Sequence, residues 1–202
     1  MLVPMNATKT IAIYNDYDGA NYNLEYKIYD AGWGSATTVV SDCKDNTTSS
    51  DWSSKHWFSA VADSSGNVHL IYVDSDDNDL NYTYFNGTSW STSTEIYTGT
   101  VSYPSLSIDN SNNLYAFFIE GNEVKYKVSQ GTSWGGSTAT LKGNINSPSY
   151  LGSAYSDNSS IGVVWREGNS YNVIFDKVAV GVFPGSVWLK GGIWLKGGVW
   201  LK

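Results

Sequence analysis

The sequence predicts an all-β fold, a β-propeller-like array of about four four-stranded antiparallel blades followed by a short C-terminal β tail. The first observation is a repeat: Asn-Gly-Thr-Ser-Trp at 86–90 returns as Gln-Gly-Thr-Ser-Trp at 130–134, 44 residues later. The second is an aromatic content of 15%, which suits the pleated faces of β-sheets. The third is that no segment has a sustained helical period of apolar residues. A repeat of this length, built from short strands, is typical of propeller blades.

The repeat domain covers residues 1–183. We divide it into units at about 9–41, 56–100, 101–143 and 144–183. The first unit has strands at 10–14, 24–29 and 37–40, and it lacks the opening strand of the later units. The second has strands at 57–63, 68–73, 80–85 and 94–97, and the third at 104–109, 114–119, 124–128 and 139–141. The fourth has strands at 148–157, 161–165 and 173–175, and residues 178–183 either form its last strand or lead into the tail.

The second strands of the middle units, 68–73 and 114–119, are apolar at successive positions. Such strands are expected to be buried on both faces. A propeller provides this burial because each blade lies between two neighbours, whereas a lone sheet does not.

The charge and the single cysteine limit the function classes. The net charge is −7, with 12 Lys plus Arg against 19 Asp plus Glu, which argues against a nucleic-acid partner. Cys43 is the only cysteine, so the chain has no internal disulfide, and we assign this thiol no role. Residues 1–10 lack the features of a signal peptide, and no window is long and apolar enough to span a membrane.

Two kinds of turn relate the sequence to known propellers. Asp-Ser-Ser-Gly-Asn at 63–67 and Asp-Asn-Ser-Asn-Asn at 109–113 each precede an apolar strand, and the Gly-Thr-Ser-Trp turns follow later in the same units. Over residues 9–180 the chain resembles the sialidase-like, Asp-box propellers and related surface-protein propellers. The strict Asp-box order, Ser-x-Asp-x-Gly-x-Thr-Trp on one hairpin, is not met, since Asp and Trp lie on different turns. The resemblance therefore supports the fold better than the hydrolase activity.

The tail, residues 184–202, has a composition of its own. Val-Trp-Leu-Lys, Ile-Trp-Leu-Lys and Val-Trp-Leu-Lys are separated by Gly-Gly, which favours a three-stranded meander with two-residue hairpins, or else stacked solenoid rungs. Either form has apolar side chains that need a partner surface, so we expect homo-oligomers. The tail resembles the Gly-Gly-Val-Trp-x-Lys endings of phage tail and virion-surface proteins, and an engineered assembly tag is the alternative. The expected assembly residues are Trp188, Leu189, Trp194, Leu195, Trp200 and Leu201.

Acidic residues end the second strand of every unit, so a propeller would gather them on one rim. They are candidate acceptors for sugar hydroxyls or a cation, or else turn caps and solvated charges, and the second interpretation is favoured. Arg166 stands beside the last of them and is the only arginine in the chain. Sialidases use several arginines to hold a carboxylate, so this count argues against sialidase catalysis. The acidic candidates are Asp16, Asp74, Glu120 and Glu167.

Three tryptophans occupy equivalent turns: Trp33, Trp90 and Trp134. Each could stack on a pyranose ring, and several such sites would act together by avidity. Alternatively each is a wedge between blades, and we favour this interpretation because a repeat must pack before it can bind.

A weak calcium pattern is present at Asp74, Asp76 and Asn78. It lacks the glycine at the sixth position and the glutamate at the twelfth, which are Asp79 and Phe85 here. No cofactor other than this calcium ion is expected. His56 and His69 have no spacing that indicates a zinc site.

The sequence therefore predicts a non-enzymatic recognition or adhesion module. We expect it to bind a glycan or another cell-surface ligand, outside the cell or on a virion surface, and to oligomerise through its tail. One alternative is a self-assembling filament or ring subunit joined by strand exchange, and a second is a sialidase-like glycoside hydrolase.

Overall fold

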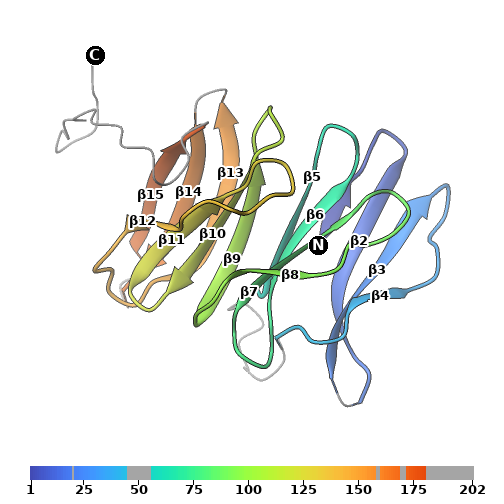
Figure 1. Cartoon of the computed structure of the whole chain (residues 1–202), viewed down its shortest axis with the longest axis horizontal. Coiled ribbons are helices and arrows are strands. Elements are labelled where there is room, and N and C mark those ends of the chain that lie inside the picture. Colours follow the sequence, from blue (N-terminus) through green and yellow to red (C-terminus); the bar gives the residue numbers. More distant parts are fainter. Residues whose placement is uncertain (20, 45–55, 158–159, 169–171, 181–202) are drawn as a thin grey trace.

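Four antiparallel sheets lie side by side in a computed structural model of the chain (Figure 1). The structure describes residues 1–19, 21–44, 56–157, 160–168 and 172–180. Within these ranges every regular element is a β-strand and there is no helix. We call the four sheets blades 1 to 4, in chain order. The expected tail, with its assembly residues, lies outside the described residues.

Each blade follows the chain from strand to strand without crossing over. Blade 1 contains β1 (Leu2–Pro4), β2 (Lys9–Tyr17), β3 (Tyr22–Asp30) and β4 (Thr37–Val40). Blade 2 contains β5 (Phe58–Ala62), β6 (Val68–Val73), β7 (Leu80–Phe85) and β8 (Thr94–Tyr97). Blade 3 contains β9 (Val101–Ile108), β10 (Leu114–Glu120), β11 (Glu123–Val128) and β12 (Ala139–Lys142). Blade 4 contains β13 (Ser149–Asp157), β14 (Ser160–Glu167) and β15 (Asn172–Ala179).

Blade 1 has an opening strand, so the expectation that the first unit lacks one is wrong. β1 pairs with β2, with Val3 opposite Ile11, and the amino group of Met1 donates to the carbonyl oxygen of Ile13 at 2.7 Å. The strand is only three residues long and precedes the repeat, so periodicity could not reveal it. In blade 4, Val178 and Ala179 end the third strand and do not begin a fourth.

Burial on both faces is confirmed for the second strands of blades 2 and 3. All six residues of β6 are buried, and so are the first six residues of β10. Ala116 and Phe118 belong to a core shared with blades 1 and 2, whereas Tyr115 and Phe117 belong to a core shared with blade 4. Alternate residues of one strand therefore serve two different blade interfaces.

The first strands of successive blades contact each other directly, as β5 with β9 and β9 with β13. Small hydroxyl side chains bridge them. The Leu106 amide donates to the Ser59 hydroxyl at 3.0 Å, and the Ser153 amide donates to the Ser105 hydroxyl at 2.8 Å. Serine suits this place because its hydroxyl satisfies a backbone donor where two strands are too close for larger side chains.

The Asp-x-x-x-Asn turns are hydrogen-bonded caps between first and second strands. In blade 2, Asp63 accepts from the amides of Ser65 and Asn67 and from the Asn67 side chain, all within 2.9 Å. Asp109 makes the same set of bonds in blade 3. The aspartates of the motif are therefore used to fold the turns.

Candidate functional site

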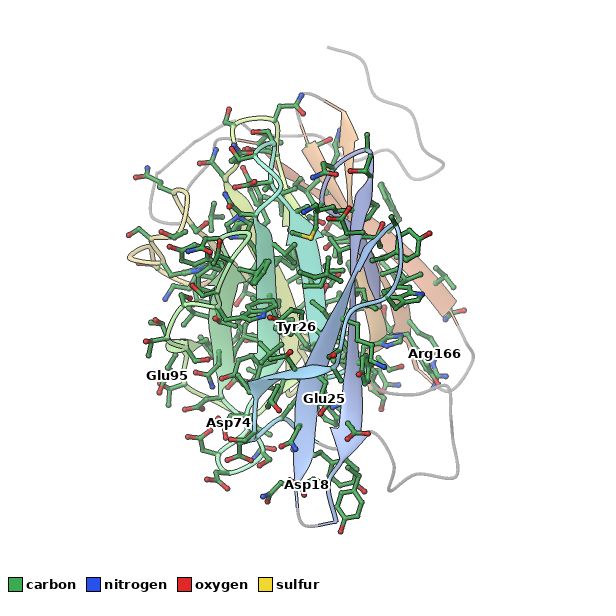
Figure 2. The ribbon with its side chains drawn as sticks, turned by 90° about the vertical axis from the view of Figure 1, so that its right-hand side faces the viewer. Asp18, Glu25, Tyr26, Asp74, Glu95 and Arg166 are labelled. Atoms are coloured by element: carbon green, nitrogen blue, oxygen red, sulfur yellow. The ribbon has the colours of Figure 1, made fainter. Side chains whose placement is uncertain are left out.

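The acidic residues expected on one rim do end the second strands of their blades. Asp16 is the last residue but one of β2, Asp74 follows β6 directly, and Glu120 and Glu167 are the last residues of β10 and β14. Figure 2 shows both Asp74 and Asp18 toward the lower end of the molecule. We call this end the acidic rim. Its parts differ in chemistry from blade to blade.

Between blades 2 and 3 the rim contains an ion pair. The Tyr97 hydroxyl donates to Glu120 at 2.6 Å, and the Lys125 ammonium binds the same carboxylate oxygen. Burial by itself would raise the pKa of Glu120, but the hydrogen bonds from Lys125 and Tyr97 outweigh it and hold the pKa below its ordinary value. A glycosidase acid needs a raised pKa, so this carboxylate is unsuited to that role.

Between blades 1 and 2 the rim is strongly acidic. One carboxylate oxygen each from Asp42, Asp74 and Asp76 lie within 4.8 Å of one another. Burial, followed by the charges of Asp42, Asp77 and Asp76, raises the pKa of Asp74 against one backbone hydrogen bond. Three converging carboxylates have the donor type that Ca²⁺ prefers.

Asp42 was missed by the sequence analysis because it stands 32 positions before Asp74, in what reads as a featureless polar loop. The fold brings the backbone next to Asp42 against the end of β6, where Asp74 lies. The backbones of Cys43 and Asp74 form an isolated antiparallel β-bridge, and the Lys44 amide donates to the Val73 carbonyl at 2.9 Å. Cys43 is buried, and burial raises the pKa of its thiol to about 12, so it is not a reactive nucleophile. The third expected calcium ligand, Asn78, accepts from the Val101 amide through its backbone oxygen.

The three tryptophans of the repeat have different environments. Trp134 is 9% exposed, and its ring contacts Tyr82 of the preceding blade with centroids 5.3 Å apart. Trp90 is half-buried and contacts Tyr26 of the preceding blade at 5.8 Å. The structure therefore places both as wedges between blades, as favoured from sequence.

Trp33 is 55% exposed and contacts only Tyr29 among the aromatic rings of the described residues, with centroids 5.4 Å apart. Tyr29 is itself exposed and belongs to the same blade. No residue of another described blade contacts this ring among the aromatic pairs of the described residues. Of the three tryptophans, this ring is the one whose surface is available for stacking.

Between blades 3 and 4 the rim combines a cation with aromatic rings. The Arg166 guanidinium lies over the ring of Tyr150, 4.9 Å from its centroid, and Tyr103 lies 5.8 Å from Tyr150 between ring centroids. Figure 2 shows Arg166 in the lower half of the molecule. Glu167 follows Arg166 in the chain. This combination of a guanidinium with phenol rings could not be read from the repeat, because Tyr103 and Tyr150 are 47 positions apart.

Two hollows lie elsewhere on the surface. One of about 200 Å³ is lined by Gln130, Ser133, Gly135 and Gly136 beside the Trp134 turn. The other, of about 310 Å³, is apolar and lies on the face of blade 4 that carries Val164 and Phe175. The first is lined by side-chain amide and hydroxyl groups, whereas the polar side chain that lines the second is that of Ser153.

Comparison with solved structures identifies the architecture. An Aleuria aurantia lectin, an N224Q mutant solved in complex with alpha-methyl-L-fucoside, matches with a TM-score of 0.57 at 15% identity, over 90% of this chain and 58% of the lectin. The Hadza microbial sialidase Hz136 matches with a TM-score of 0.35 at 10% identity, over 90% of this chain and 52% of the sialidase. The chain thus spans little more than half the length of either. No family model and no curated protein sequence matches it.

The chain has a β-propeller-like fold, similar to that of this lectin. The predicted all-β, propeller-like class is confirmed, and four antiparallel sheets of three or four strands account for it. Among the described residues of this propeller, none forms a helix of the length and apolarity that crossing a membrane requires.

A buried cluster inside blade 2 of the propeller was not anticipated. His69 Nδ1 lies 2.7 Å from the Tyr82 hydroxyl, and His69 Nε2 lies 3.5 Å from an Asp63 oxygen. Burial lowers the pKa of His69, and the attraction of Asp63 opposes this without cancelling it. The imidazole is therefore neutral at pH 7, and it supports the Asp63 turn and Tyr82 from within the blade.

Proposed function

We propose that this propeller is a non-enzymatic recognition module that binds a carbohydrate. It acts on a cell or virion surface and oligomerises through its tail. The observation that carries the proposal is the blade 3–blade 4 rim, with Arg166 stacked on Tyr150. The lectin that shares the fold was solved with a fucoside, which supports a sugar as the ligand class.

The chemistry of this rim fits sugar hydroxyls. A guanidinium offers several fixed N–H donors, and Glu167, the next residue in the chain, is a candidate acceptor at the same end of β14. The Arg166 guanidinium covers one face of the Tyr150 ring, and an exposed aromatic ring is what packs against the C–H surface of a pyranose. Trp33 with Tyr29 forms a second aromatic surface on blade 1, so a glycan with several branches could engage two places at once.

The hydrolase alternative has less support. Glu120 is tied to Lys125 and Tyr97, and its lowered pKa is opposite to what a general acid requires. Arg166 is the single arginine of the chain, whereas a carboxylate clamp of the sialidase kind uses several.

The assembly alternative has one specific observation behind it. Val164, Val173 and Phe175 expose large apolar side chains on blade 4, where the array ends among the described residues. Such a surface suits contact with another protein surface, as well as with the tail itself.

The proposal is tested by screening the full chain on a glycan array and titrating the best ligand into Arg166→Gln. The matched control is Lys177→Gln, which removes an exposed positive charge from the same blade. We expect Arg166→Gln to weaken binding at least about tenfold, equivalent to about 1.4 kcal/mol, and the control to bind normally. Thermal melting of both variants checks that folding is intact.

Two outcomes would overturn the proposal. One is a chain that binds no glycan on the array, or binds equally well without the Arg166 guanidinium. The other is turnover of an aryl glycoside that disappears in Glu120→Gln, which would favour the hydrolase.

A further inference from the structure

One row of side chains crosses every blade at the same level. It contains the residue three positions before the acid that ends the second strand, and the aromatic residue opposite it on the third strand. The pairs are Ile13 with Tyr26, Ile71 with Tyr82, Phe117 with Tyr126 and Val164 with Phe175. Opposite residues of paired strands share one face of the sheet.

This row is turned toward the following blade. Tyr26 contacts Trp90 of blade 2, with ring centroids 5.8 Å apart. Tyr82 contacts Trp134 of blade 3 in the same way, at 5.3 Å. A tryptophan of one blade on an aromatic residue of the blade before it is therefore a contact that the array uses twice.

In blade 4 the same face is uncovered among the described residues. Ile13, Ile71 and Phe117 are 0% exposed, whereas Val164 in the same row is 38% exposed. Phe175 is 69% exposed, and no tryptophan of a described blade covers it. Blade 4 thus presents the receiving half of the repeated contact.

Blade 1 presents the other half. Trp33 stands at the position of Trp90 and Trp134, is 55% exposed, and contacts Tyr29 of its own blade. Figure 1 shows blades 1 and 4 at opposite ends of the described array. The two exposed halves therefore cannot meet within the described part of one chain.

The first strands carry a second repeated contact. Leu106 and Ser153 face the preceding blade, because their amides donate to serine hydroxyls there. Each lies opposite the residue four positions before the acid that ends the second strand. Leu2 has this position in blade 1, and its side chain is 66% exposed.

The uncovered face of blade 4 is hollowed at the level where such a side chain would enter. Gly152 lies opposite Val164, where blades 2 and 3 have serine opposite Ile71 and Phe117. Together with Gly162 it lines an apolar hollow of about 310 Å³ beside Phe175.

The sizes of the facing residues are complementary. Between blades 3 and 4, the receiving face has the large Tyr115 and the entering strand has the small Ser153. Gly162 occupies the position of Tyr115 in blade 4, five residues before the acid. A small receiving residue suits a large entering residue such as Leu2.

We propose that this face of blade 4 binds blade 1 of a second copy of the chain, in the arrangement by which each described blade binds the next. Trp33 of the second copy packs on Phe175, and Leu2 enters the hollow over Gly152. A second copy is the occupant because the contact continues an interface that the array already contains, and each half of it is exposed at one end. The contact is heterologous, so copies join head to tail.

This assembly uses described residues of the blades and does not depend on a sugar ligand. In it Trp33 becomes a packing residue like Trp90 and Trp134. The sugar-binding proposal then rests on Arg166.

The test is the self-association of the full chain, measured by sedimentation equilibrium over a wide range of concentrations. Trp33→Glu disables the blade 1 face, and Phe175→Glu disables the blade 4 face. The matched control is Tyr17→Glu, since Tyr17 is 54% exposed at the end of β2 and contacts Tyr22 of its own blade. Far-UV circular dichroism checks folding, and Trp33→Ala with Phe175→Ala replace any glutamate variant that does not fold.

We expect each disabling variant to weaken self-association at least about tenfold, because a carboxylate is then buried against apolar groups without a partner. The control should associate like the wild type. An equimolar mixture of the two disabling variants should regain association and stop at two chains, since one intact pair of faces remains. Native mass spectrometry identifies this mixed dimer by its mass.

Four results would overturn the proposal. The first is a wild-type chain that stays monomeric at every concentration. The second is equal association of the wild type and both disabling variants, which would indicate assembly through another segment. The third is a loss in Phe175→Glu alone, which would indicate a different occupant of blade 4. The fourth is a mixture that associates no more strongly than either variant by itself.

Discussion

Replacing Trp134 by Ala tests whether the repeated tryptophans hold the blades together. Trp134 is 9% exposed and contacts Tyr82 across the interface between blades 2 and 3. Truncating a buried tryptophan typically costs about 3–5 kcal/mol of unfolding free energy. Its indole Nε1 has no hydrogen-bond partner among the described residues, so the truncation also removes a burial penalty of about 1–3 kcal/mol. The central values of the two effects differ by about 2 kcal/mol, which is the net loss that we expect.

The matched control is Trp33→Ala at the equivalent position of blade 1. Trp33 is 55% exposed and touches no preceding blade, so we expect its replacement to change the unfolding free energy by about 0.5 kcal/mol or less. Urea unfolding followed by far-UV circular dichroism measures both variants, since aromatic fluorescence would change with the mutation itself. Similar losses in the two variants would refute the wedge interpretation, because the repeat position alone would then decide the energy.

Two further predictions concern pH and calcium. Burial lowers the pKa of His69 in the folded state below its unfolded value near 6.5, so the free energy of unfolding falls as the pH drops below about 6.5. His69→Gln keeps a polar partner for Tyr82 and should lose this pH dependence. Thermal melts between pH 4 and 8 measure the difference. A melting temperature of the variant that still falls in parallel with the wild type would contradict this. The pKa of Asp74 is raised in the folded state, so the ionised carboxylate destabilises the fold at neutral pH. Asp74→Asn should therefore be more stable than the wild type at pH 7. This difference in stability should vanish below about pH 4, where Asp74 is protonated in both the folded and the unfolded state. Millimolar Ca²⁺ should raise the melting temperature of the wild type and leave Asp74→Asn unchanged, and a shift of equal size in both would exclude Asp74 as a ligand.

Periodicity could predict most of the blade array, because each repeated blade places the same strands in the same environment between neighbouring blades. β6 and β10 had to be buried on both faces, and their apolar sequences indicated this directly. β1 could not be found in this way, since three residues contain no measurable period and its evidence is the pairing of Val3 with Ile11. Features that occur once are invisible to an argument from repeats.

The candidate sites illustrate the same limit. The positions of the rim acids were predictable because each lies at the end of the second strand of its blade, yet their chemistry depends on neighbours that differ from blade to blade. Glu120 is neutralised by Lys125 and hydrogen-bonded by Tyr97 of blade 2, whereas Asp74 meets Asp42 from the end of blade 1. The position of each acid is set by the repeat, but its ionisation depends on particular neighbours, such as Lys125 of the same blade and Tyr97 of the preceding blade for Glu120.

The tryptophans show how one position of the repeat can differ in exposure from blade to blade. Trp33, Trp90 and Trp134 come from the same turn of the same repeat, and the sequence around them does not separate a wedge from a binding surface. What separates them is the presence of a preceding blade: Tyr26 and Tyr82 cover Trp90 and Trp134, while Trp33 has only Tyr29 of its own blade. The same reasoning applies to blade 4, where Phe175 is exposed at the position that Tyr26 and Tyr82 fill elsewhere. Residues that pack between blades in the middle of the described array are thus exposed at its two ends. A ligand or partner that binds these exposed residues would not disturb the contacts between the central blades.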